Sequence, residues 1–133
     1  MTIGYDAKHI VCDNTGPGSY GRTLVNDIAE AATPGIMLNL YTPERGDDAL
    51  RRQIQPRQNI RFVYPEATIN PIKKALWRTR GVVSALVNDG VKLYHGLSGE
   101  LPTGIKEAGI KTVVTIHDLI FMRHPEWYSW AGR

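Results

Sequence analysis

Strand-like and helix-like segments alternate along this chain, and that alternation is the feature that most constrains its fold. The expected strands are short apolar segments at residues 3–6, 36–41, 60–63, 92–94 and 112–116. Apolar residues at three- and four-residue spacing predict helices over 20–32 and 71–88, and residues 45–54 and 103–108 predict at most short helices. Such alternation with short connections predicts an α/β fold, a Rossmann-like, doubly wound parallel sheet in a three-layer α/β/α arrangement.

Composition places the chain among ordinary globular domains. Its 133 residues are 42% hydrophobic and 22% charged, which suits a single domain with a sizeable core. A net charge of +3 is compatible with phosphate-bearing ligands or an anionic membrane, and is too small to indicate nucleic acid. Cys12 is the only cysteine, and there is neither a signal segment nor a long apolar run. We therefore expect a cytoplasmic protein, with peripheral contact to the inner membrane face as an alternative.

A glycine-rich segment precedes the first long helix. Gly16, Gly18 and Gly21 match the spacing G-x-G-x-x-G of dinucleotide-binding turns. Residues 7–15 separate this segment from the first strand, and no acidic residue ends the second strand, so the dinucleotide interpretation is disfavoured. A glycine loop that opens a helix still gathers backbone N–H groups that suit a phosphate, with Gly16, Gly18 and Ser19 as donors. The alternative is a purely structural glycine turn.

Histidines end two successive predicted strands. His117 and Asp118 follow the last strand, and His95 follows the strand before it. Neighbouring residues on a strand point to opposite faces, so His117 and Asp118 are not expected to form a hydrogen-bonded dyad. An imidazole at this edge can contact a hydroxyl, a phosphate or a sugar, whereas the alternative is a histidine that is hydrogen-bonded to backbone. The spacing of these residues does not match a metal site.

The helix predicted over 71–88 carries a cluster of basic residues around a tryptophan. On a regular helix Lys73, Lys74, Trp77 and Arg78 lie side by side. They lie opposite an apolar stripe formed by Ile72, Ala75, Leu76, Val82, Val83, Leu86 and Val87. This composition is typical of contact with an anionic membrane surface. The alternative is that Trp77 packs beneath a neighbouring loop.

The carboxyl-terminal residues contain aromatic side chains without evident partners. Trp127, Tyr128 and Trp130 lie where a helix would be expected to cover the last strand. We therefore expect a truncated domain. Without a covering helix these aromatic side chains would be exposed, and we expect them to favour self-association.

Several segments together resemble a known family. The matching segments, in order, are Ile3–Ala7, Thr15–Tyr20, Leu93–Gly96, Val113–Leu119 and Arg123–Glu126. They resemble the amino-terminal domain of nucleotide-sugar-dependent glycosyltransferases of family 4, which have two Rossmann-like domains in the GT-B arrangement. The pattern spans nearly the whole chain and is not specific to a particular sugar.

The resemblance implies transfer of a sugar from a nucleotide-sugar donor to a glycan or lipid-linked acceptor, with retention at the anomeric carbon, in bacterial polysaccharide or envelope assembly. It implies that Gly16, Gly18 and Ser19 bind the donor diphosphate, and that His117 and Asp118 are catalytic residues beside the reacting sugar. His95 and Tyr20 would lie on the acceptor side. Neither a metal nor a cofactor is implied, because the nucleotide sugar is a co-substrate.

The resemblance covers only the acceptor-side domain of such an enzyme, over residues 1–133. The carboxyl-terminal domain, with most nucleotide contacts and a glutamate pair, has no counterpart here, so we expect no appreciable transferase activity from this chain alone. Two alternatives stay open. One is a non-catalytic phosphate- or nucleotide-binding or scaffold domain, and the other is a dinucleotide-dependent oxidoreductase, which the long segment 7–15 disfavours.

Overall fold

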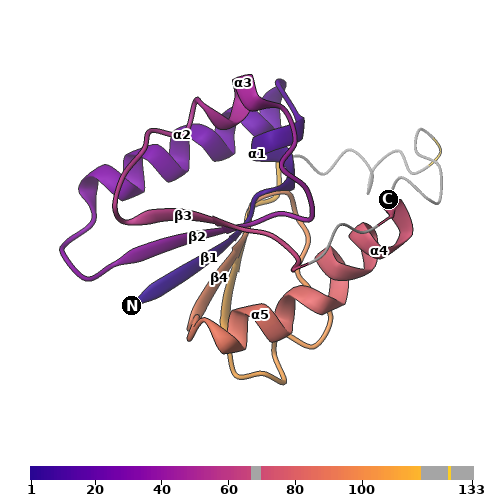
Figure 1. Cartoon of the computed structure of the whole chain (residues 1–133). Helices are drawn as coiled ribbons and strands as arrows, with labels where there is room; N and C mark the ends of the chain where they lie inside the picture. The colour runs from indigo at the N-terminus through magenta and orange to yellow at the C-terminus, as the bar shows by residue number, and fades with distance from the viewer. Residues whose placement is uncertain (67–69, 118–125, 127–133) are drawn as a thin grey trace.

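A computed structural model describes residues 1–66, 70–117 and 126. A five-stranded parallel sheet forms its centre, in the order β3-β2-β1-β4-β5 (Figure 1). The strands are β1 (Thr2–Asp6), β2 (Met37–Tyr41), β3 (Ile60–Val63), β4 (Leu93–Gly96) and β5 (Lys111–Val114). The predicted α/β, Rossmann-like parallel sheet is therefore confirmed. The chain order reverses at β1, so the carboxyl ends of β1 and β4 flank the point where ligands bind in open α/β sheets.

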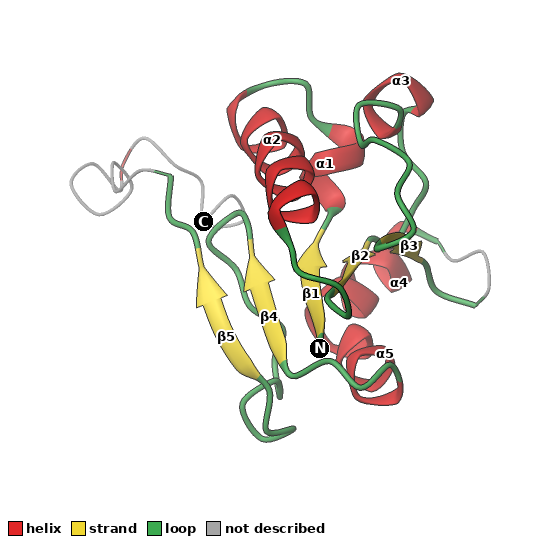
Figure 2. Ribbon diagram, turned by 90° about the vertical axis from the view of Figure 1, so that its left-hand side faces the viewer, coloured by secondary structure: helices red, strands yellow, loops and turns green. Residues whose placement is uncertain are grey.

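Helices cover both faces of this sheet (Figures 1 and 2). One face carries α1 (Lys8–Cys12), α2 (Gly16–Ala31) and α3 (Asp48–Arg51), and the other carries α4 (Pro71–Leu76), the π-helical turn η1 (Trp77–Gly81) and α5 (Val82–Asn88). Side chains of β2 alternate between the two layers, because successive strand residues point to opposite faces. Leu38 and Leu40 join the core beneath α2, and Tyr41 joins the core beneath α5.

The glycine-rich segment is helical, and the loose loop expected there is wrong. Helix α2 begins at Gly16, so the segment forms its first turn, with Pro17 at a position that helices tolerate. Gly18 is buried against the end of α1. A Cβ atom there would collide with the carbonyl oxygen of Asp13 and lie 2.6 Å from that of His9. The glycine therefore allows two backbones to approach closely, which is a packing role.

Arg22 ties the same two helices together. Its side chain is buried, and its guanidinium Nη1 donates to the carbonyl oxygens of Ile10 and Asp13 at 2.9 and 2.7 Å. Its Nε donates to Gln53 Oε1 at 2.7 Å. These bonds satisfy carbonyl groups at the end of α1, a helix that the sequence did not predict.

The single helix predicted over 71–88 is interrupted by η1. A π turn inserts one extra residue, which rotates α4 by about 100° relative to α5. Val82 and Leu86 are buried in the core, whereas Ile72 and Leu76 of the predicted apolar stripe are 75% and 53% exposed. The short helix expected over 103–108 is also wrong, because residues 103–109 form consecutive turns.

Among the described residues, every helix is too short or too polar to cross a bilayer. The self-association hypothesis rested on three aromatic residues that lie outside the described residues, namely Trp127, Tyr128 and Trp130.

Candidate functional site

Four side chains meet at the carboxyl edge of β4 and β5, beside the first turns of α2. Tyr20, His95, Thr115 and His117 form what we call the histidine cluster. His95 Nε2 lies 2.7 Å from Thr115 Oγ1, and Tyr20 Oη lies 3.4 Å from the same oxygen. The rings of Tyr20 and His117 meet edge to face at 5.1 Å between centroids. Figure 2 shows β1, β4 and β5 side by side and pointing toward this edge.

The structure thus brings together three of the residues singled out from the sequence. Tyr20, His95 and His117 come from α2, β4 and the segment after β5. Thr115 links two of them and was not singled out as a site residue. The parallel register of β4 and β5 pairs His95 with Val113, so Thr115 follows two residues later, on the same face of the sheet. That register is the signal that identifies Thr115.

Hydrogen bonding defines the tautomer of His117. Its Nε2 lies 2.7 Å from the carbonyl oxygen of Leu97, and because a carbonyl only accepts, Nε2 must carry the proton. In the neutral ring Nδ1 then holds the lone pair and can accept a hydrogen bond. The residue as a whole is exposed at this edge. One nitrogen of His117 is therefore hydrogen-bonded to backbone, which was the alternative given for this histidine in the sequence analysis. The other nitrogen can accept a hydrogen bond from a ligand.

His95 is half-buried between Tyr5 and Thr115. Burial lowers the pKa of His95 below its ordinary value of 6.5, since a charged imidazole loses hydration there. His95 is therefore neutral at pH 7, and its Nε2 can share a proton with the Thr115 hydroxyl in either direction.

This lowered pKa makes stability depend on pH. Below the ordinary pKa the unfolded chain binds a proton that folded His95 resists, so the free energy of unfolding should fall as the pH drops through and below 6.5. Urea unfolding across this window should show a steeper decline for the wild type than for His95→Gln. All other titratable groups are present in both proteins, so their contributions cancel when one stability curve is subtracted from the other. Parallel curves would therefore contradict the burial of His95.

The residues expected to bind a diphosphate lie in the first turn of α2. Gly18 is buried for packing, whereas Gly16 and Ser19 are exposed. The Asp13 carboxylate already accepts from the backbone N–H and the hydroxyl of Thr15 at 2.8 and 2.5 Å, and these bonds lower the pKa of Asp13. A diphosphate approaching this end of α2 would meet that negative charge. Asp118, the other residue expected to be catalytic, lies outside the described residues.

The basic face proposed for membrane contact is not assembled. Arg78 points inward, with only 15% of its side chain exposed, and Lys74 forms an ion pair with Glu44 at 3.1 Å. Trp77 is partly buried against the core beneath α5, and Lys73 stays exposed. The expectation that all four residues share a solvent-facing side is wrong, because η1 breaks the regular helix on which it was drawn.

Arg78 instead forms a charged network with residues that the sequence did not indicate. Its Nε and Nη2 bind the two carboxylate oxygens of Asp6 at 3.1 and 2.6 Å. Nη2 also donates to Ser98 Oγ at 3.2 Å, and Nη1 lies 2.8 Å from Glu100 Oε2. Asp6 ends β1 and is 5% exposed, so this bidentate pair is largely desolvated.

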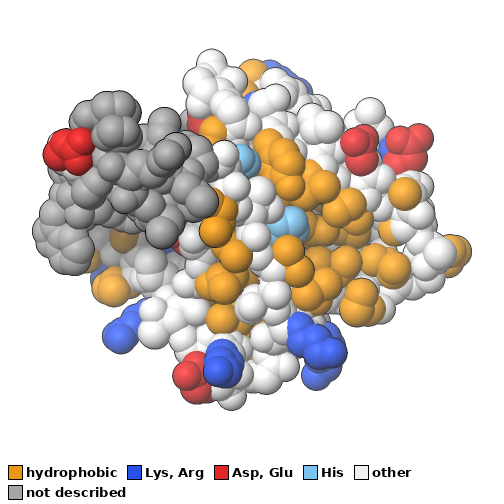
Figure 3. All heavy atoms as spheres, turned by 180° about the vertical axis from the view of Figure 1, so that it is seen from behind, with side chains coloured by type: hydrophobic (Ala, Val, Ile, Leu, Met, Phe, Trp, Pro, Cys, Tyr) orange, Lys and Arg blue, Asp and Glu red, His pale blue; other side chains and the backbone are white. Residues whose placement is uncertain are grey.

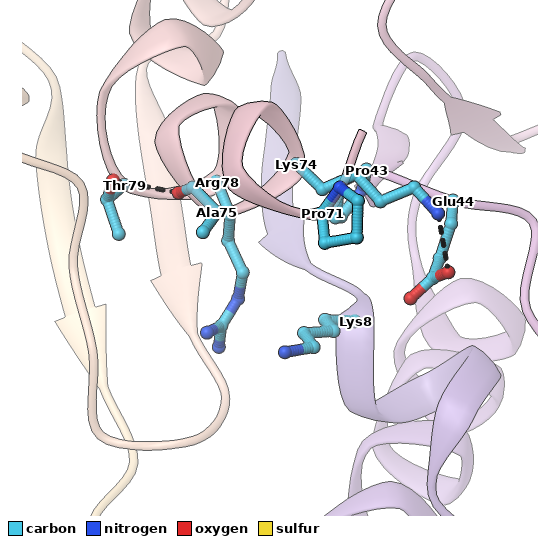
Figure 4. Close-up of a pocket in the computed structure, with 8 residues that line it drawn as sticks. All are labelled: Lys8, Pro43, Glu44, Pro71, Lys74, Ala75, Arg78 and Thr79. Atoms are coloured by element: carbon cyan, nitrogen blue, oxygen red, sulfur yellow. Dashed lines mark hydrogen bonds and ion pairs between the residues drawn. The ribbon is translucent and has the colours of Figure 1, made fainter. Parts of the chain in front are cut away.

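A cavity of about 280 Å³ opens beside this network, between α4 and the segments that follow β1 and β2 (Figure 4). Its lining consists of Lys8, Pro43, Glu44, Pro71, Lys74, Ala75, Arg78 and Thr79. Glu44 accepts from Lys74 Nζ inside the cavity and from the Cys12 thiol at 3.5 Å. Three of the four charged side chains that line the cavity are cationic, and Glu44 is the fourth.

A broad apolar area, with histidine side chains within it, covers part of the face seen in Figure 3. Within the described ranges, no group of three or more His, Cys, Asp or Glu side chains could hold a metal ion. Comparisons of this chain with protein-family models, with curated proteins and with solved structures find no match.

Proposed function

We propose that this chain is the acceptor-side domain of a retaining glycosyltransferase of the GT-B type. The observation that carries this proposal is the convergence of Tyr20, His95 and His117 on Thr115 and its surroundings at the carboxyl edge of the sheet. The edge position agrees with ligand binding in open α/β sheets, and the residues are those that the family resemblance selects.

The histidine cluster suits a ligand rich in hydroxyl groups. His117 Nδ1 can accept from a sugar hydroxyl, while Thr115 Oγ1 and Tyr20 Oη can both donate and accept. The aromatic ring of Tyr20 offers an apolar face beside these groups. We propose that these side chains orient the sugar acceptor.

A complete transferase of this type would bind most of its nucleotide sugar through a second domain. The contribution of residues 1–133 would then be to position the acceptor. Action in a bacterial cytoplasm, on a glycan or lipid-linked acceptor, belongs to the same proposal.

Amide chemical shifts in a ¹H–¹⁵N titration would test it. The ligands would be methyl glucoside, methyl mannoside, myo-inositol, UDP-glucose and GDP-mannose. We expect saturable shifts around Tyr20, His95 and Thr115 for at least one ligand, and about tenfold weaker binding by Thr115→Val, which loses the shared hydroxyl.

Thr112→Val is the matched control, because Thr112 lies exposed on β5, three residues before Thr115, and belongs to no contact described for the histidine cluster. Equal binding by both variants, shifts confined to another part of the molecule, or no saturable shift with any ligand would each overturn the proposed function.

A further inference from the structure

Lys8 presents a charged group that has no ion pair within hydrogen-bonding distance among the described residues, although its charge adds to the effect of the Lys74 hydrogen bond in lowering the pKa of Glu44. It begins α1, directly after the segment that follows β1, and its half-buried side chain points into the cavity toward Arg78 (Figure 4). Among the described residues its ammonium makes neither an ion pair nor a hydrogen bond. The Lys8 ammonium can therefore donate to a ligand in the cavity.

The other charges of the cavity are already compensated. Arg78 contacts two carboxylates, Asp6 and Glu100, and Lys74 pairs with Glu44. Together with Lys8, these three cations and three carboxylates sum to zero. Asp6 and Glu100 do not line the cavity, so its wall carries Lys8, Lys74 and Arg78 against Glu44 alone, and this uneven placement of charge attracts an anion.

Unused hydrogen-bond donors also point to an anion. Arg78 has five N–H groups, and the bonds to Asp6, Ser98 and Glu100 use four of them. The Lys74 ammonium has three N–H donors and uses one of them on Glu44. The three N–H donors of Lys8 are all unused. Lys8 and Arg78 thus keep unused donors on facing sides of the cavity, and Lys74, whose Nζ turns toward Glu44, keeps two more (Figure 4).

We propose that this cavity binds a phosphate monoester. A phosphate monoester dianion carries three strong acceptor oxygens, which match donors arriving from Lys8, Lys74 and Arg78, whereas a carboxylate has two. The volume of about 280 Å³ leaves room for a small organic group attached to the phosphate. The site shares no residue with the histidine cluster, so it does not depend on the proposed glycosyltransferase function.

Titration of the protein with glycerol 3-phosphate, followed by amide chemical shifts at about 0.1 M ionic strength, tests this site. Glycerol serves as the uncharged analogue. We expect saturable shifts around Lys8, Glu44 and Arg78, and binding that tightens as the pH rises through about 6, where the monoester becomes a dianion. Lys8→Gln should weaken binding about tenfold, the effect of losing one charge-assisted hydrogen bond.

Lys111→Gln is the matched control. It removes the same charge from an exposed lysine at the amino end of β5, on the opposite edge of the sheet. Its affinity should stay within about twofold of the wild type, because surface charges are screened over roughly 10 Å. Circular dichroism would verify that both variants are folded.

Vesicles identify the source of the phosphate. Flotation with phosphatidic acid in phosphatidylcholine, against vesicles that carry equal charge as phosphatidylserine, would show whether the monoester can be a lipid headgroup. Lys8-dependent binding to glycerol 3-phosphate alone supports a soluble ligand, and Lys8-dependent binding to phosphatidic acid vesicles supports a lipid. Equal loss of affinity in Lys8→Gln and Lys111→Gln, or no saturable binding of either monoester up to about 5 mM, overturns the proposal.

Discussion

Replacing Gly18 with alanine should destabilise the protein by about 3 kcal/mol, as strongly as overpacking a core does. The added methyl group would collide with the carbonyl oxygen of Asp13 and press on that of His9. Both atoms belong to backbone that Arg22 holds in place through hydrogen bonds at the end of α1, so neither can move without breaking other contacts. Urea unfolding monitored by circular dichroism would measure the loss.

Gly16→Ala is the matched control for this experiment. Gly16 lies in the same turn of α2, and a methyl group there meets no atom within 4 Å. Alanine forms helix better than glycine, so this variant should be unchanged or more stable by up to about 0.5 kcal/mol. If the two variants lost stability equally, the close approach of α1 and α2 would not explain Gly18.

Asp6→Ala should cost about 3 kcal/mol, because it leaves the guanidinium of Arg78 largely desolvated without its bidentate partner. Ser98 and Glu100 still contact Arg78, and they keep the loss at the lower end of the range for broken buried pairs. Thermal and urea unfolding would both report the change. The double variant Asp6→Ala with Arg78→Met should recover part of the loss, since no buried charge then remains unpaired.

The exposed pair between Asp48 and Arg51 supplies a comparison. Three quarters of the Asp48 side chain is exposed, and its carboxylate lies 3.6 Å from Arg51. Asp48→Ala should change stability by less than about 1 kcal/mol, because solvent screens such pairs. Similar losses in Asp6→Ala and Asp48→Ala would show that burial of the Asp6–Arg78 pair contributes little.

The parallel sheet and its functional edge could be predicted because the relevant patterns are local. Runs of β-branched and other apolar residues marked all five strands, with boundaries that differ from the observed ones by a few residues. Parallel strands end at one edge, so His95, near the carboxyl end of β4, and His117, after β5, were expected on the same side. Both belong to the histidine cluster in the folded chain.

Patterns of helical spacing failed where the backbone departs from the regular α-helix. The period of 3.6 residues assumes an unbroken helix over 71–88, and η1 changes the phase in its middle. Arg78 was therefore assigned to the solvent face, and Ile72 to the core. Both assignments are reversed in the structure, where Arg78 is inward and Ile72 is exposed.

The local sequence by itself determined the alternation of strands and helices. This alternation in turn determined at which edge of the sheet the polar side chains lie. Tertiary structure alone decided which side chains face one another there. Asp6 and Arg78 are 72 residues apart and pair because the sheet and the π turn bring them together. Gly18 is required only because α1 ends against it. Contacts of this kind depend on distances between segments, which no local pattern of residue types encodes.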